Sequence, residues 1–230
     1  MPKTPGIITS NLILNLDAGN TASYPGTGTT WTDLSTNGKN ATLNNGVGYS
    51  SLNGGSLTFD GTNDQCTLPV CNFPSSGART LNVWIKPNTL STIRTIFSYG
   101  GTGALTSNPL HINVLSAGDV YWGFNNADFY VPGTQLSTTA WTNICCTYAG
   151  GNLNTTNVKI YINGVQKTLT TTGGNLNQIP NTTNMNYTIS YDNNSRYYNG
   201  NTSIISFYNI ELTQSEITQN FNAIKSRYGL

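Results

Sequence analysis

The chain carries few charged residues for its length. Only 8% of its 230 residues are charged, and its formal net charge is +1. It has no basic stripe for a nucleic acid and no acidic tail for a basic partner, so neither kind of binding is expected. Asn, Ser and Thr must therefore provide most of the polar groups that contact water at the surface. A nearly neutral surface also gives little repulsion between copies, which favours close-packed assembly.

Long apolar segments are missing as well. The opening residues, Met1 to Gly6, lack the apolar core of a signal peptide, and no run reaches the ~18 apolar residues of a membrane span. We therefore expect a protein that is made in the cytoplasm without a signal peptide and is not inserted into a membrane.

Groups that support catalysis are scarce. The nine acidic residues include two glutamates, Glu211 and Glu216, and no expected strand carries two carboxylates on one face. Glycosidases need such a pair, and Ser-His-Asp chemistry would depend on the single histidine, His111, which alternates with apolar neighbours. No Gly-rich phosphate loop precedes a helix. The sequence predicts a protein that is not an enzyme, with glycoside hydrolysis as the weakest alternative.

The four cysteines suggest neither a disulfide framework nor a zinc site. Cys145 and Cys146 are adjacent, so on a strand they point to opposite faces. Cys66 and Cys71 would close only a short loop, and the spacing matches no common zinc motif. Reduced, structural thiols are the favoured interpretation.

Strand patterns dominate what is present. Val158, Ile160 and Ile162 alternate with polar or amphipathic residues, and Asn163-Gly164 then supplies the two positive-φ positions of a type I′ hairpin turn. The segment 141–148 reads as the preceding strand. Further strands are expected at 11–17, 41–43, 56–61, 66–68, 80–87, 95–99, 110–114, 120–124, 129–131, 187–191 and 203–208.

One helix is expected at the C-terminal end, over residues 214–228. Thr213 and Glu216 have the spacing of a capping box, and Gly229 follows as a stop. The apolar face of this helix comprises Ile217, Phe221, Ile224 and Tyr228. We predict a flexible N-terminal arm (1–11) and one antiparallel β-sandwich domain (12–230) that includes this helix, with a polar loop at 170–184.

Four motifs, in this order, resemble one family. They are L-x-F-D-G-x-x-D (57–64), V-W-I-K (83–86), W-x-x-I-C-x-T-Y followed by V-K-I-Y-I-N-G (141–164), and F-Y-N-I-E-L-T-Q-S-E-I (207–217). The chain resembles the laminin-G-like, concanavalin A-like lectin/glucanase domains. The resemblance implies an all-β jelly roll with a short C-terminal amphipathic helix.

The stretch 16–35, with L-D-A-G-N and S-Y-P-G-T-G-T-T-W-T-D-L-S, is similar to the variant found in structural proteins of phages and large viruses. This resemblance implies a virion protein: a capsid decoration, minor capsid or tail-associated protein made in the host cytoplasm. Its partners would be other virion proteins or its own copies, and it would adhere to host surface glycans. The alternative is a free carbohydrate-binding lectin.

Three positions depart from the family pattern. Cys145 matches one half of the disulfide of the pentraxin branch, but Asn82 stands where the other half would be. Ser203 replaces an Asp that many relatives carry, and Ser35-Thr36-Asn37-Gly38 replaces S-G-N-G. These departures weigh against a family-type calcium site.

Calcium remains the candidate cofactor. Asp60, Asn63 and Asp64 place hard oxygen ligands within one turn, with Asp17 and Asp33 as further donors. The alternative, which the sequence favours, is a plain turn in which the Asp60 side chain bonds nearby backbone N–H groups.

Exposed aromatics beside Asn and Asp would form a glycan site. The densest group is Tyr121, Trp122, Asn125, Asn126, Asp128 and Tyr130, and a second comprises Tyr191, Tyr197 and Tyr198. Aromatic strand residues of a sandwich usually lie in the core. We expect a core position for Trp122, and we assign Trp31, Trp84 and Trp141 to the core.

Overall fold

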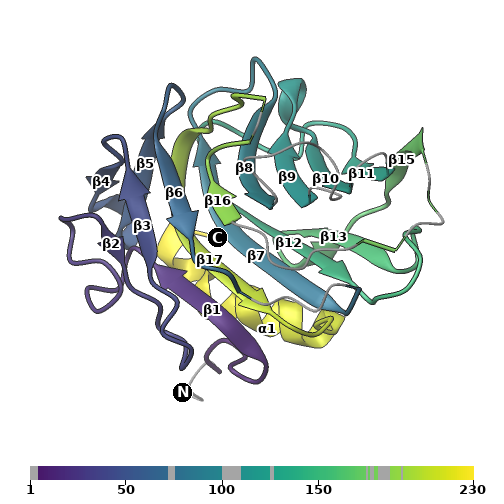
Figure 1. The fold of residues 1–230 in the computed structure, drawn as a ribbon, viewed down its shortest axis with the longest axis horizontal. Coiled ribbons are helices and arrows are strands. Elements are labelled where there is room, and N and C mark those ends of the chain that lie inside the picture. The colour runs from purple at the N-terminus through teal and green to yellow at the C-terminus, as the bar shows by residue number, and fades with distance from the viewer. Residues whose placement is uncertain are drawn as a thin grey trace.

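The computed structural model describes residues 5–71, 76–99, 110–124, 127–174, 176, 179–180, 187–192 and 194–230. Within them, the strands form two antiparallel sheets that pack face to face, as predicted (Figure 1). Short 3₁₀ turns occur at Leu52–Gly54 and Ser116–Gly118.

The first sheet has eight strands. In spatial order these are β14 (Val165–Gln166), β13 (Val158–Ile162), β12 (Thr142–Tyr148), β7 (Arg79–Pro87), β17 (Asn199–Tyr208), β5 (Ser56–Asp60) and β4 (Gly48–Ser50), with β1 (Leu12–Asp17) also paired to β17. The predicted hairpin is confirmed, because Asn163 (φ 51°) and Gly164 (φ 78°) both take positive φ between β13 and β14.

The second sheet has nine strands. In order these are β15 (Thr170–Gly174), β11 (Ala127–Val131), β10 (Val120–Phe124), β9 (Leu110–Val114), β8 (Arg94–Tyr99), β16 (Tyr187–Ile189), β6 (Gln65–Leu68), β3 (Ala41–Asn44) and β2 (Thr30–Trp31). The main core lies between the two sheets and includes Trp31, Phe59, Ile112, Trp122 and Ile160.

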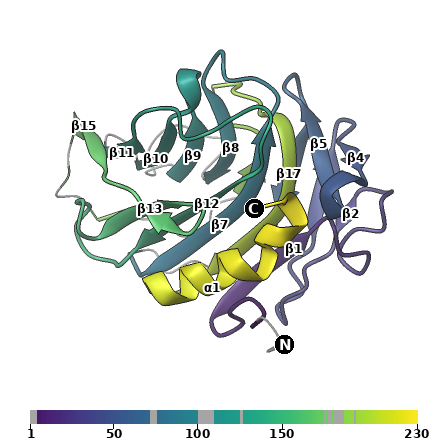
Figure 2. The same cartoon turned by 180° about the vertical axis from the view of Figure 1, so that it is seen from behind.

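Helix α1 (Gln214–Ile224) and the 3₁₀ turn η3 (Lys225–Tyr228) cover the outer face of the eight-stranded sheet (Figure 2). Trp84 stacks on Phe221 with ring centroids 5.6 Å apart and contacts Tyr228 at 4.5 Å. The predicted capping box between Thr213 and Glu216 is present. The helix therefore covers part of the outer face of the first sheet.

The structure differs from the sequence predictions in three places. Thr170–Gly174, expected as a loop, forms β15 because β11 offers it an unpaired edge. The short strands β2 and β4 were not predicted. In the segment expected as an arm, the N–H of Ile8 donates to Asn220 Oδ1 on the helix (2.7 Å), and its carbonyl accepts from Tyr208 Oη on β17 (3.0 Å). The flexibility of the arm stays a prediction. Residues 1–4 lie outside the described part.

All four cysteines are buried and free. Cys146 belongs to the core between the sheets and Cys145 to the cluster beneath the helix, as the strand geometry predicted. Burial raises the pKa of both thiols. In the described residues, no helix is long and apolar enough to cross a membrane.

Candidate functional site

A polar row crosses the outer face of the nine-stranded sheet at the centre of β9, β10 and β11. His111, Gly123 and Asp128 are register partners on these three strands. Their neighbours along the strands, such as Ile112 and Trp122, point into the core. Because successive strand residues alternate between faces, the row lies on the opposite, outward side of the sheet.

Gly123 forms the floor between two polar side chains. A Cβ atom at this glycine would lie 2.1 Å from His111 Nε2 and 2.7 Å from Asp128 Oδ1. Within the described part of the chain, neither side chain has an ion-pair or hydrogen-bond partner, although both are partly exposed. His111 Cε1 would also lie only 2.2 Å from that Cβ, so the imidazole itself occupies the space over the glycine, with Asp128 Oδ1 close by.

The charges around this row are mixed. Burial lowers the pKa of His111, and Arg196 lowers it further, while Asp128 and Asp192 act in the opposite direction. Because burial is the largest of these effects, the imidazole is neutral at physiological pH. Asp128 is the carboxylate in direct line with it across the sheet.

Two tyrosines border the row on the same face. Tyr121 and Tyr130 are register partners that lie two residues from Gly123 and Asp128 on β10 and β11. Their rings stack with centroids 5.1 Å apart and planes inclined by 17°. Both are partly exposed. Burial raises the pKa of Tyr121, so its hydroxyl stays protonated and able to donate.

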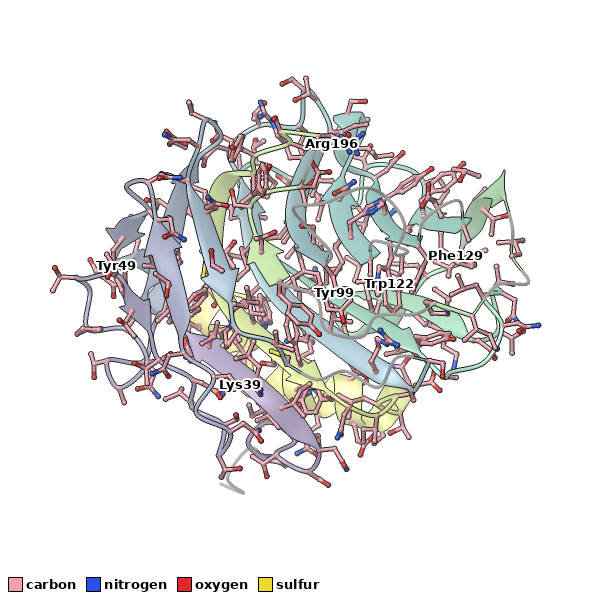
Figure 3. The ribbon with its side chains drawn as sticks, in the orientation of Figure 1. Lys39, Tyr49, Tyr99, Trp122, Phe129 and Arg196 are labelled. Carbon is pink, nitrogen blue, oxygen red and sulfur yellow. The ribbon has the colours of Figure 1, made fainter. Side chains whose placement is uncertain are left out.

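The loop between β16 and β17 forms a wall on the β8 side. Ser98 Oγ donates to Tyr191 O (2.6 Å), and Thr95 N donates to Arg196 O (3.2 Å), so the loop is fixed to β8. Asp192 holds the loop by accepting from Asn194 N (2.9 Å) and pairs with the guanidinium of Arg196 at 3.6 Å. Figure 3 places Arg196 at the outer side of the β8 and β9 ends, and Trp122 between the two sheets.

Thr95 and Asn113 form a second cross-strand pair below this wall. Thr95 Oγ1 and Asn113 Oδ1 are buried, and each lacks a hydrogen-bond partner. Unpaired buried oxygens of this kind are usually satisfied by an ordered water.

Comparison with known proteins assigns the family. A family model described as the concanavalin A-like lectin/glucanases superfamily, of the laminin-G type, matches residues 60–218, more than half of the chain. The chain belongs to this superfamily. A search of curated protein sequences finds no match.

Solved structures agree on the fold of this lectin/glucanase domain. Domain 4 of the Geobacillus stearothermophilus arabinanase AbnA, in complex with arabinotriose, is 19% identical (TM-score 0.65; 91% of this chain and 98% of that one). The binding domain of Paraclostridial Mosquitocidal Protein 1 is 16% identical (TM-score 0.70; 94% and 52%). Trypanosoma rangeli sialidase is 15% identical (TM-score 0.67; 96% and 34%). This chain thus corresponds to about half of the toxin binding domain and to about a third of the sialidase.

The carboxylates nearest the row differ in how they are engaged. Of the acids that face His111, Asp192 has Oδ1 engaged by Asn194 N and Arg196 N, which leaves Asp128 with free oxygens. Glu211 pairs with Lys159 (2.7 Å) and Glu216 completes the helix cap, so both act on the helix side of the molecule.

Ser98, His111 and Asp128 follow one another across the sheet, but Ser98 is not placed to act as a nucleophile. The hydroxyl of Ser98 donates to Tyr191 O, and its side chain is almost fully buried. A nucleophilic serine has to give its proton to the histidine.

The structure brings together three of the predicted glycan-site residues. Tyr121, Asp128 and Tyr130 share the outer face, whereas Trp122 is fully buried, as expected for a core residue. Asn125 and Asn126 lie outside the described residues. The prediction did not include His111 and Gly123. The position of His111 between Leu110 and Ile112 on a strand was the available signal that it points outward.

In the second predicted group, Tyr191 and Tyr197 are paired at 5.0 Å beside the wall, but Tyr198 is fully buried. The three remaining tryptophans, Trp31, Trp84 and Trp141, are at most 5% exposed. Their assignment to the core is therefore confirmed.

The predicted calcium ligands lie in one turn but bond to the backbone. Asp60 Oδ1 accepts from Thr62 N (2.7 Å), and Asp64 Oδ2, which is buried, accepts from Asp60 N (3.0 Å). These contacts lower the pKa of Asp60, and burial raises that of Asp64. Asn63 is exposed. The described residues contain no cluster of three or more His, Cys, Asp or Glu side chains suited to a metal.

The other two candidate calcium donors are also engaged within the chain. Asp17 forms a two-pronged ion pair with Arg227 (2.6 and 2.9 Å). Asp33 accepts from the N–H groups of Asn15, Ser35 and Lys39. These geometries fit turns and ties between elements better than an ion site. Calcium binding stays a prediction.

The departures from the pentraxin pattern are visible in the sheet. Cys145 on β12 is the register partner of Asn82 on β7, so this position carries no disulfide. Ser203 donates its hydroxyl proton to Gly55 O (2.6 Å).

Proposed function

We propose that this domain is a non-catalytic carbohydrate-binding module whose glycan lies on the outer face of the nine-stranded sheet. The observation that carries the proposal is the convergence of His111 Nε2 and Asp128 Oδ1 over Gly123. The two atoms do not bond to each other, yet both approach one point above the glycine. A sugar hydroxyl that approaches the two groups from the solvent side would donate to the carboxylate and bond the imidazole.

The tyrosine pair complements these polar groups. A sugar ring presents an apolar face of C–H groups and a rim of hydroxyls, so it suits a site with aromatic rings beside hydrogen-bonding groups. Tyr121 and Tyr130 offer ring surface and hydroxyls one register step from the His111–Asp128 pair. The arabinanase domain with this fold is described in complex with arabinotriose, which is consistent with the proposal.

The test is a glycan array probed with the full chain, with and without EDTA. We expect specific binding that Tyr130→Ala reduces. Tyr49→Ala is the matched control, because Tyr49 is an exposed tyrosine on β4 in the other sheet. Hydrolysis is assayed separately by reducing-sugar release from every array hit, and no release is expected. An array without any hit would refute the proposal, and sustained release would refute the non-catalytic part.

We infer that the setting of this module is a virus particle, where it contacts virion proteins or copies of itself and adheres to host glycans. The support is the sequence resemblance together with the sheet edges. Of the edge strands, β14, β4, β15 and β2 carry no charged residue in the described chain, whereas β1, which pairs only with β17, carries Asp17. Val165 on β14 is 58% exposed. Edges of soluble monomers are usually guarded by charge, so uncharged edges favour coverage by a partner.

Light scattering at increasing concentration and co-sedimentation with purified particles would test this setting. Val165→Lys would place a charge on one edge and should weaken any self-association through it. A monomer at all concentrations that binds no particle would contradict the virion setting and leave the free lectin, which the glycan array tests independently.

A further inference from the structure

We propose that the outer-face site selects uncharged sugars and rejects sugars that carry a carboxylate. This inference rests on the proposed function and specifies its ligand class. The observation behind it is the distribution of charge around the His111–Gly123–Asp128 row, where the one ionic group with free oxygens is an acid.

Four groups decide the charge around His111, and Asp119 adds a further acid beside Tyr121. Asp128 and Asp192 are acidic, Arg196 is basic, and His111 is neutral at physiological pH, which leaves a net negative charge around the imidazole. The amino group of Lys39 donates to Val70 O, which follows β6. The amino group of Lys159 pairs with Glu211 beside the helix. They do not compensate the charge at the row.

The single cation near the row is already engaged. The guanidinium of Arg196 lies 3.6 Å from Asp192 Oδ2, and the backbone N–H of Arg196 donates to Oδ1 of the same carboxylate (3.2 Å). A ligand carboxylate would have to compete with Asp192 for this guanidinium while approaching Asp128. Recognition of a carboxylate normally uses an arginine whose two N–H groups are free to form a fork.

The free groups instead match hydroxyls. Asp128 is an acceptor with two oxygens, so it suits neighbouring hydroxyls of a neutral ring, each of which donates one proton. The hydroxyl of Tyr121, which also bonds the side chain of Thr172, and the hydroxyl of Tyr130 lie next to it. A carboxylate in the same place has no proton to donate, and at a separation of a few ångströms its repulsion from Asp128 costs about tenfold or more in affinity.

The experiment compares pairs of glycans that differ by one carboxylate, namely lactose with 3′-sialyllactose and oligogalactosides with oligogalacturonides. Affinities are measured for the full chain at low and at physiological salt. We expect the neutral member of a bound pair to bind at least about tenfold more tightly, and the ratio to shrink as salt screens the repulsion. Asp128→Asn, which keeps the shape but removes the charge, should bring the ratio towards one.

Glu211→Gln is the matched control, because it removes one negative charge on the helix side and should leave the ratio unchanged. Equal or tighter binding of the acidic members would overturn the charge selection while leaving carbohydrate binding intact. An unchanged ratio in Asp128→Asn would overturn the role of this carboxylate. Binding to no member of any pair would count against the proposed function itself.

Discussion

Replacing Gly123 with alanine tests the geometry of the site most directly. The new methyl group would lie 2.1 Å from His111 Nε2 and 2.7 Å from Asp128 Oδ1, so at least one of these atoms has to move. Both atoms are the far ends of flexible, partly exposed side chains, and rotation can relieve the clash. The substitution therefore displaces the imidazole from its place over the glycine without demanding a backbone shift.

The effect on stability should be small. Overpacking a site typically costs about 1–3 kcal/mol, and relief by side-chain rotation favours the low end of that range. Removing the conformational freedom of a strand glycine returns about 0.5–1 kcal/mol. We expect Gly123→Ala to lower the free energy of unfolding by about 1 kcal/mol or less, as measured by urea unfolding followed by tryptophan fluorescence.

The effect on binding should be much larger than the effect on folding. Displacing the imidazole and the Asp128 carboxylate from this arrangement removes a hydrogen bond to a charged group, which corresponds to about tenfold in affinity or more. Titration calorimetry with the best array glycan measures it. Gly6→Ala is the control, since an added Cβ there meets nothing within 4 Å. Unchanged affinity in Gly123→Ala would refute this assignment of the site, and an unfolding penalty well above 3 kcal/mol would refute the relief by rotation.

Three further outcomes follow from buried groups. Trp84→Ala should lower the free energy of unfolding by about 3–5 kcal/mol in urea titrations, because Trp84 is 1% exposed and stacks on Phe221; Phe221→Leu should cost clearly less. Cys66 and Cys145, whose thiol pKa burial raises, should react with a thiol reagent only after unfolding. Burial lowers the pKa of His111, so the unfolded chain takes up the proton first; stability should fall as pH drops below about 6.5, and urea titrations of His111→Gln should have a flatter profile.

Much of the fold could be predicted because its signals are local. The alternation of Val158, Ile160 and Ile162 defines a buried strand face without reference to any partner. The Asn163-Gly164 turn and the Thr213–Glu216 cap likewise act within a few residues. β15 was missed for the opposite reason: its sequence is polar and rich in Thr and Gly, and pairing with β11 alone makes it a strand.

The candidate site was predicted only in part, because it depends on register. Tyr121, Asp128 and Tyr130 lie on one hairpin, so proximity in sequence was enough to group them. His111 belongs to the next strand, and its approach to Asp128 requires the pairing of β9 with β10 and of β10 with β11. Gly123 matters because its missing side chain lets the His111 imidazole lie over it, and composition does not reveal that packing.

The register that creates the site is the same register that buries the core. A slip of one residue in β10 would turn Trp122 to the outer face and move Tyr121 and Gly123 into the interior. Burial of Trp122 and Phe124 therefore stabilises the orientation in which Gly123 separates His111 from Asp128. Helix α1 lies on the outer face of the eight-stranded sheet. In the described chain, the outer face of the nine-stranded sheet carries no such helix. The packing that stabilises the sandwich thus determines both where a ligand can bind and which groups it meets there.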